Sequence, residues 1–366
     1  MTHRERFVRT MMYKPVDRVP DYEFGAWNQT ITRWHNEGLP LEFTGERAAV
    51  KEYCNTETIV DMGLITRMLP GYECKVLEEK GNHIIIQNDE GAICEMLRPE
   101  LGASVPKYLK FAIENKKDWE KIRDERLNPN DSKRIPANIE KICKDSWISE
   151  DPISVDAGSI YGWLRNWMGV ENLSCAIYDD PEWIEEMMEH LTCLTLTVLE
   201  KIAGKAKVDQ GEWWEDMCFK SGPLLSPEYV NKWMVPRYKR VTDFLRNECS
   251  CKFNVLDCDG NIHKLVPLWY EGGINIMWPL EAAHTDAYKI SEQFGKRMGL
   301  RGYFNKIALI YGKEAIDREF ERIRPLFERG GYIPHLDHLV PPDVSFENFQ
   351  YYMRKKHEFI GKRIPE

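Results

Sequence analysis

A chain of 366 residues, of which 43% are hydrophobic and 30% charged, has enough apolar material to bury a large core, and this excludes a disordered protein. Its formal net charge of −9 excludes an extended basic surface, so neither nucleic acid nor an anionic membrane is an expected partner. The N-terminal segment lacks the apolar core of a signal peptide, and the ten cysteines are scattered without a CxxC pair. We therefore expect a cytoplasmic protein with reduced thiols and no membrane span.

The first part of the chain has an irregular pattern. Residues 4–12 predict an opening helix, and residues 18–24 predict a first strand. Residues 74–97 predict a β-hairpin, in which 83–87 and 92–95 flank an Asn-Asp-Glu-Gly turn. We expect this hairpin to be an excursion from the main sheet.

From residue 150 onward, short β-prone runs alternate with longer helical patterns, which is typical of a parallel sheet covered by helices. Carboxylates and prolines mark the helix starts before 182–203 and 228–246, and Ser345 starts a C-terminal helix. No linker divides the chain, so we expect one α/β domain over residues 1–366, a (β/α)8 barrel with the N-terminal helix and hairpin over its mouth. The predicted strands of this region are 151–157, 206–212, 252–258, 273–281, 298–304 and 331–336.

Polar side chains follow several of these strands, at the end where a β/α barrel builds its active site. Asp257 and Asp259 lie at one strand end and, as residues i and i+2 of an extended segment, point the same way. Glu281, Glu215 and His338 follow other strands. A bound cation or shared protons would relieve the repulsion among so many carboxylates, and carboxylate with imidazole suits zinc.

The same residues also have a purely structural interpretation. Asp257 and Asp259 would then accept hydrogen bonds from backbone amides of the turn that follows them, and His335 and His338 would bond to Asp337. The residue types alone leave both interpretations open.

Motifs in a fixed order along about 340 residues carry a resemblance. Among them are Pro-Val-Asp-Arg-Val-Pro at 15–20, Pro-Leu-Glu at 279–281 and Val-Pro-Pro-Asp-Val at 340–344. The further matching segments are 4–7, 158–163, 214–217, 221–227, 259–261, 302–306, 330–334 and 337–338. Together they resemble the uroporphyrinogen decarboxylase superfamily, which implies a (β/α)8 barrel.

The resemblance points to the methyltransferase-like branch of this superfamily and away from the haem-pathway decarboxylases. True decarboxylases carry an arginine-bearing segment after the first strand that meets the substrate carboxylates. Residues 25–30 hold Gly-Ala-Trp-Asn-Gln-Thr at that place, and no arginine follows before Arg33. A substrate with many carboxylates would therefore lose its main cationic clamp.

Corrinoid-dependent methyltransferases of the superfamily bind zinc through a His-x-Cys pair at one strand end and a cysteine near the last strand. The matching positions here are Asp257-Cys258-Asp259 and His338. The resemblance therefore implies a zinc site of Asp257, Asp259 and His338, with oxygen and nitrogen ligands in place of sulfur.

The function that the resemblance implies is methyl transfer from a small methylated compound, such as a methoxylated aromatic, to a separate corrinoid protein. A metal or carboxyl acid at Asp257, Asp259 and His338, helped by Glu281 or Glu215, would activate the departing oxygen.

An aromatic pocket is expected around this site. Trp27, Trp163 and Trp214 are expected to bind the substrate, with Arg165 beside them, although a tryptophan is also a common core residue.

Two other functions stay open. In a decarboxylase or lyase of a small carboxylic acid, Asp257 would protonate a carbanion while Arg165, Arg67 or Lys306 held the carboxylate. The other is a non-catalytic subunit that docks a corrinoid protein, which the lack of an Asp-x-His-x-x-Gly cobalamin motif disfavours. The resemblance implies a monomer or a homodimer.

Overall fold

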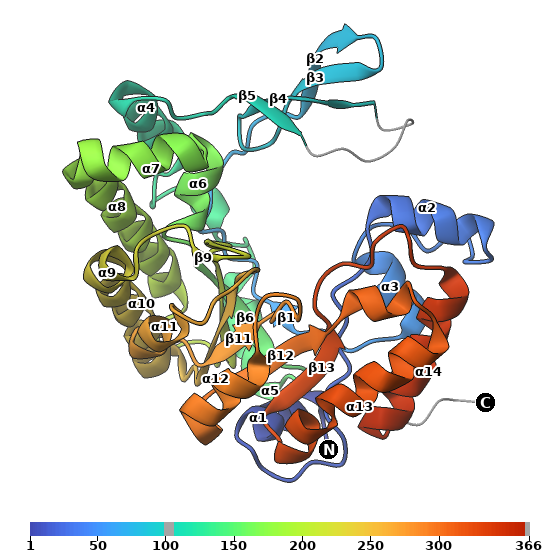
Figure 1. Ribbon diagram of the computed structural model, residues 1–366. Helices are drawn as coiled ribbons and strands as arrows, with labels where there is room; N and C mark the ends of the chain where they lie inside the picture. The colour runs from blue at the N-terminus through green and yellow to red at the C-terminus, as the bar shows by residue number, and fades with distance from the viewer. Residues whose placement is uncertain (99–105, 363–366) are drawn as a thin grey trace.

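A parallel β-sheet forms the centre of the computed structural model, which describes residues 1–98 and 106–362 (Figure 1). Each strand pairs with the next one along the sheet, and all of these pairs are parallel. The seven strands, in sheet order, are β1 Val60–Asp61, β6 Ile153–Gly158, β7 Gln210–Trp214, β10 Phe253–Asp257, β11 Ile276–Trp278, β12 Gly299–Phe304 and β13 Tyr332–Leu336.

The extended segment 18–26 takes the eighth place and completes an α/β barrel. Ala26 forms a parallel bridge to Val340, just beyond β13, and the backbone oxygen of Asp21 accepts from the amide of Glu57, just before β1. The prediction of a regular strand at 18–24 is wrong, because only this single bridge is formed. Pro20 has no amide hydrogen to donate to a ladder, which disfavours a regular strand at this point.

Helices cover the outside of the barrel (Figure 1). Helix α1 packs Phe7 and Met11 against Phe253 and Ile333, and so fills the amino-terminal end of the barrel with apolar side chains. The opposite, carboxyl-terminal end is left to build a site. The helices are α1 His3–Met11, α2 Asn28–Asn36, α3 Ala48–Cys54, α4 Lys116–Arg126, α5 Ile139–Ile148, α6 Gly162–Met168, α7 Val170–Asp179, α8 Pro181–Leu199, α9 Pro227–Tyr229, α10 Val235–Cys249, α11 Val266–Glu271, α12 Ala287–Phe294, α13 Lys313–Arg329 and α14 Phe346–Ile360.

The helix predicted at 228–246 is divided. α9 passes into a π-helical turn, η4 Val230–Met234, before α10 begins. Pro236 stands in the first turn of α10 and cannot donate the hydrogen bond that would continue one regular helix. The predicted helix at 182–203 is confirmed, as α8 followed by the 3-10 turn Glu200–Ile202.

A small antiparallel sheet stands apart from the barrel strands, near α6 (Figure 1). The predicted hairpin is confirmed by the pairing of β3 His83–Gln87 with β4 Ile93–Leu97, and β2 Lys75–Lys80 and β5 Lys107–Lys110 extend it to four strands. The side chain of Asn166 on α6 donates to Glu90 in the β3–β4 turn at 2.8 Å. The sheet is thereby attached to the rim of the barrel mouth.

Two strands, β7 and β11, differ most from the predicted ranges. β7 begins at Gln210, and not at 206, because the amide of Val208 bonds to the oxygen of Cys249 outside the ladder. β11 is limited to Ile276–Trp278 and is followed by the cis peptide bond before Pro279. Among the described residues, no helix is long and apolar enough to cross a membrane.

Candidate active site

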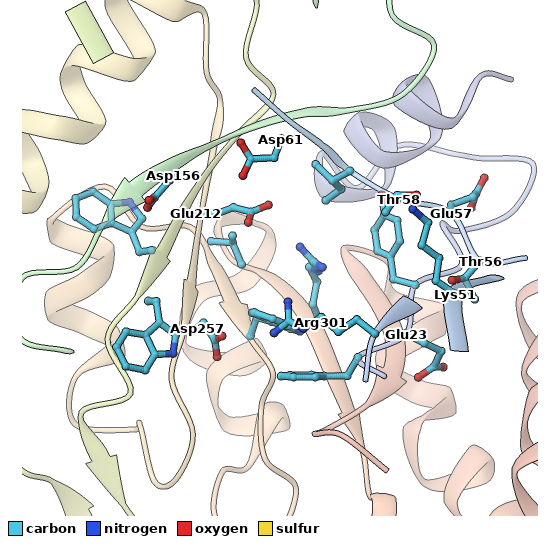
Figure 2. Close-up of a pocket in the computed structure, with 18 of the residues that line it drawn as sticks. Glu23, Lys51, Thr56, Glu57, Thr58, Asp61, Asp156, Glu212, Asp257 and Arg301 are labelled. Carbon is cyan, nitrogen blue, oxygen red and sulfur yellow. The ribbon is translucent and has the colours of Figure 1, made fainter. Parts of the chain in front are cut away.

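A cavity of about 540 Å³ opens at the carboxyl-terminal end of the barrel strands. This volume suits a small molecule. Side chains of the strands β1, β6, β7, β10, β11 and β12 line it, together with the extended segment 22–24, residues 47–51 at the start of α3 and the segment 56–67. Figure 2 shows four of its carboxyl groups and one buried guanidinium, which belong to Asp61, Asp156, Glu212, Asp257 and Arg301.

Asp257, the last residue of β10, is the carboxyl group with the strongest perturbation in this pocket. Burial raises its pKa well above the usual range, and the neighbouring carboxyl groups of Asp259 and Asp216 raise it further. The pKa of Asp259 is raised to about 7, first by burial and then by Asp216 and Glu281. Two adjacent carboxyl groups therefore hold protons that an ordinary aspartate would lose.

The structure brings Asp259 and His338 together across the barrel mouth. Their closest atoms, Oδ2 and Nε2, are 3.5 Å apart, and the other carboxyl oxygen of Asp259 is buried without a hydrogen-bond partner among the described residues. The rings of Phe24 and Trp27 lie against the imidazole, with centroids 5.2 Å and 5.7 Å away. Burial, and then Lys306, lower the pKa of His338, so its neutral form is favoured.

Glu281 supports the loop that carries Asp259. Its Oε2 accepts from the amide of Gly260 at 3.1 Å, and its Oε1 lies 3.4 Å from the ammonium group of Lys306. Lys306 also lies 3.7 Å from Asp337. Glu281 therefore has a positioning role close to the pocket, and Lys306 is held by two carboxylates.

Glu215 does not line this pocket. Its buried carboxylate accepts from the amides of Ile160, Tyr161 and Gly162, at 2.9, 2.8 and 2.9 Å. The hydroxyls of Ser159 and Tyr238 also donate to it, at 3.1 Å and 2.8 Å. The expected catalytic role is corrected to a structural one, because five donors occupy this carboxylate and fix the start of α6.

The expected substrate-binding residues fall into three positions. Trp163 and Trp214 line the cavity with ring centroids 4.9 Å apart, whereas Trp27 lies at the rim and is 39% exposed. Arg165 does not line the cavity, because it forms an ion pair with Asp216 at 2.6 Å. Its guanidinium is therefore already neutralised.

The zinc site implied by the resemblance does not fit this arrangement. Within residues 1–98 and 106–362, no three His, Cys, Asp or Glu side chains are grouped as metal ligands. Asp259 and His338 are in contact, but within the described residues they form a pair and not a set of three ligands. Zinc therefore stays a prediction, and no chemical step is assigned to it.

The structural interpretation of the acidic pair is not favoured either. Within the described part of the chain, neither carboxyl group of the pair accepts a backbone amide, although the oxygen atoms of Asp337 accept from Ala282 and Lys306. His335 does not bond to Asp337. Its Nδ1 donates to the oxygen of Leu336, and its Nε2 accepts from the indole of Trp278.

Several charged residues of the pocket were not expected from the sequence, among them Asp61, Asp156 and Arg301. Asp61 is the second residue of β1, a strand of only two residues, which is too short to produce a pattern. Asp156 and Glu212 lie inside predicted strands, and Arg301 is a single charged residue in an otherwise apolar strand. A charged residue inside a predicted buried strand is the sequence signal that could have indicated these pocket residues, because a buried charge needs a partner or a ligand.

Comparisons with known proteins agree with this geometry. The family model of uroporphyrinogen decarboxylase (URO-D) matches residues 95–359. The fold is similar to that of a methyltransferase from Methanosarcina mazei, with a TM-score of 0.61 at 16% sequence identity, covering 98% of this chain and 99% of that chain. At 16% identity, the similarity to the Methanosarcina mazei protein shows a shared fold alone. The match to the family spans most of the sequence, and the chain therefore belongs to the uroporphyrinogen decarboxylase family.

Proposed function

We propose that this protein is a methyltransferase that removes a methyl group from a small methoxylated compound bound in the barrel mouth and passes it to a corrinoid protein. The observation that carries the proposal is the pair Asp257 and Asp259, two neighbouring carboxyl groups with raised pKa values beside an aromatic pocket. An alkoxide or phenoxide leaves slowly unless its developing charge is neutralised, and a protonated carboxyl group supplies the proton.

In the proposed reaction, the bond between the methyl carbon and oxygen breaks as Asp257 donates its proton to that oxygen. The electron pair of the broken bond stays on oxygen, and the substrate leaves as an alcohol or phenol. The methyl group goes to Co(I) of the partner's corrinoid, whose electron pair forms the new bond to carbon. Asp257 regains a proton from solvent through the neighbouring Asp259, which contacts His338.

The other residues of the pocket hold the substrate and limit its access to water. Trp163 and Trp214 form one wall, and Phe24 stacks on Trp278 at 4.8 Å on another. Such walls suit a planar ring. The corrinoid protein would dock at the rim, where Trp27 is exposed.

The test is a direct assay for the transferred methyl group. The full-length protein is incubated with chemically reduced cob(I)alamin and with anisole, guaiacol or para-methoxybenzoate, and methylcobalamin and the demethylated product are measured. The wild-type protein should form both in equal amounts, and Asp257→Asn should form both at least about 100-fold more slowly. If none of these methoxylated compounds is demethylated, the proposal fails.

A second candidate is decarboxylation of a small acid, because four cationic side chains line the same cavity. Arg47, Lys51, Arg67 and Arg301 suit a carboxylate, and Asp257 would protonate the carbanion left when carbon dioxide departs. Of the three cations expected for this role, only Arg67 lines the cavity, since Arg165 and Lys306 are paired with carboxylates. Release of carbon dioxide without methylcobalamin would favour this candidate.

A further inference from the structure

Arg301 is a buried cation that has neither an acidic partner nor a set of backbone acceptors in the described chain, whereas Arg134, which also lacks an ion pair, donates to four backbone oxygen atoms. It is only 9% exposed, and among the described residues its guanidinium makes one hydrogen bond, from Nη1 to the side-chain oxygen of Gln210 at 3.3 Å. Its Nε is buried without a partner, and no carboxylate of the described chain lies within ion-pair distance. Arg4 and Lys306, in contrast, each form an ion pair with a carboxylate.

An unpaired guanidinium at this depth has a cost. Transfer of a charge out of water is unfavourable unless a counter-charge and hydrogen bonds replace the water. Two rings flank the group, with the centroids of Tyr22 and Trp278 at 5.1 Å and 5.5 Å, but a cation–π contact replaces only a small part of the lost hydration. Arginine keeps its proton even where burial lowers its pKa, as it does here, so the charge remains.

The open side of Arg301 is the cavity itself (Figure 2), so an occupant of the cavity can supply the missing acceptor. A guanidinium presents two parallel N–H groups, which match the two oxygen atoms of one carboxylate. Asp257 and Glu212 line the same cavity, but in the described chain neither forms an ion pair with the guanidinium, so its positive charge stays available to a ligand.

The strand register shows where such a ligand would lie. Asp257 on β10 pairs with Trp278 on β11, and Met277 pairs with Leu300 on β12. Asp257, Trp278 and Arg301 therefore lie at one level on three successive strands, and all three line the cavity. Neighbouring strands are about 4.8 Å apart, so the Cα atoms of Asp257 and Arg301 are about 10 Å apart. The strand between them carries the aromatic ring of Trp278.

We propose that Arg301 is the carboxylate anchor of the pocket, and that the substrate is a small aromatic acid held with its carboxylate at Arg301 and its ring over Trp278. This orientation directs the opposite end of the ring towards Asp257. The identity of the bond that breaks rests on the proposed function. The role of Arg301 concerns only the binding of the carboxylate and can be tested without the reaction.

The test uses pairs of ligands that differ in charge alone. Binding of benzoate and para-methoxybenzoate to the full-length protein is measured by calorimetry beside binding of their primary amides. The acids should bind about tenfold or more tightly than the amides, the effect of one charge-assisted bidentate contact. Acids that bind no better than their amides would overturn the inference without any variant being made.

Two variants then locate the anchor. Arg301→Gln should remove the preference for acids, and Arg301→Lys, which keeps the charge but loses the fork, should keep only part of it. Arg318→Gln, at an exposed position of α13 outside the cavity, is the matched control and should keep the full preference. A preference that survives in Arg301→Gln, or disappears in Arg318→Gln, would overturn the assignment.

The two proposals can fail separately. Demethylation of anisole, guaiacol or para-methoxybenzoate, together with acids that bind no better than their amides, would remove the anchor and leave the methyltransferase. Tight binding of the acids without any methylcobalamin would leave the anchor and remove the methyltransferase.

Discussion

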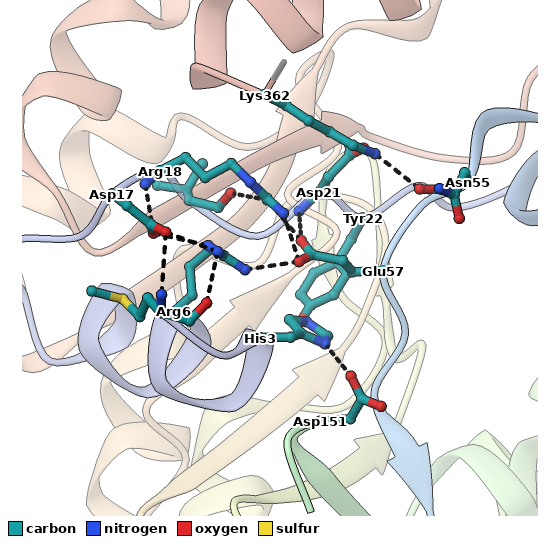
Figure 3. A network of polar contacts seen from close by, with 12 residues as sticks. His3, Arg6, Asp17, Arg18, Asp21, Tyr22, Asn55, Glu57, Asp151 and Lys362 are labelled. Carbon is teal, nitrogen blue, oxygen red and sulfur yellow. Dashed lines mark hydrogen bonds and ion pairs between the residues drawn. The ribbon is translucent and has the colours of Figure 1, made fainter. Parts of the chain in front are cut away.

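Two groups of charged side chains near segment 18–26 have contrasting electrostatics. The closure cluster, part of which Figure 3 shows, consists of Arg6, Asp17, Arg18, Asp21, Glu57, Lys356 and Lys362. The mouth cluster consists of Glu212, Asp257, Asp259 and Arg301. In the closure cluster every carboxylate has a cation within 3 Å, whereas the mouth cluster has no ion pair of that kind among its own members.

The pKa values follow this difference. A hydrogen bond from Arg6 lowers the pKa of Asp17 to about 2. Burial alone would raise the pKa of Asp21, but Lys356, His357 and Lys362 outweigh it and hold this pKa far below the usual range. Asp257 and Asp259 are half-buried beside like charges, and their pKa values rise. The paired charges of the closure cluster stabilise the fold. Carboxyl groups with raised pKa values in a cavity are typical of an active site.

The largest effect is expected from removal of one buried cation of the closure cluster. Lys356 is fully buried, with its ammonium 2.9 Å from Asp21 and 2.6 Å from Glu23. Lys356→Met leaves both carboxylates without this partner and should lower the free energy of unfolding by about 3–5 kcal/mol, measured in urea. The matched control is the neighbouring Lys355→Met, whose pair with Asp317 is on the surface, and it should cost less than about 1 kcal/mol. Equal losses in the two variants would contradict the comparison.

The corresponding change in the mouth cluster should affect activity and not stability. Asp257→Asn removes the proposed proton donor and should lower the rate of demethylation by about 100-fold or more. Its free energy of unfolding should be unchanged or higher, because a buried acid beside like charges is replaced by a neutral group. Asp243→Asn, at a solvent-exposed ion pair on α10, is the control and should match the wild type in both measurements. A stable Asp257→Asn variant with full activity would exclude Asp257 as the acid.

A smaller effect is expected from the neighbour of the acid. Asp259→Asn removes a negative charge that helps to raise the pKa of Asp257. Asp257 should then lose its proton at lower pH, so the fall of kcat/KM on the alkaline side should move to lower pH. The pH profile of the demethylation rate measures this shift. An unmoved profile would mean that the two carboxyl groups titrate independently.

The meeting of Asp259 and His338 was predictable because it needs only the rule that strand ends of a barrel share one mouth. The position of Glu215 could not be predicted from the sequence. Its five hydrogen-bond donors belong to residues 159–162 and to Tyr238, and their positions depend on tertiary packing.

Strand patterns had a similar limit. β12 and β13 were predicted within one residue, since each is an apolar run that the barrel buries. Segment 18–26 has the length of a strand but is fixed mainly by the side chains of Asp21 and Glu23, which bind Lys356 on the last helix. Predicting that Arg301 points into the cavity requires the register between β10, β11 and β12. The apolar runs of the sequence locate these strands but do not give their register.

The smallest expected effect is an opposite response of the two clusters to pH. The folded-state pKa of Asp17 is lowered from 3.8 to about 2, so its contribution to stability is present above about pH 4 and is lost as the pH falls towards 2. The pKa of Asp259 is raised from 3.8 to about 7, so its contribution is greatest below about pH 4 and is lost as the pH rises through 7.

Melting temperatures of two variants between about pH 5 and pH 8 separate these responses. Asp17→Asn should melt below the wild type across this whole range, because the ionised carboxylate that it lacks is the stabilising form. The melting temperature of Asp259→Asn should rise relative to that of the wild type as the pH increases towards and through 7. The reason is that the wild-type carboxyl group must ionise next to Asp216 and Glu281. Both side chains are partly exposed, at 46% and 33%, so solvent screening should keep each difference below about 1 kcal/mol. A parallel change in both variants would show that the charges of the mouth cluster are as well matched as those that close the barrel.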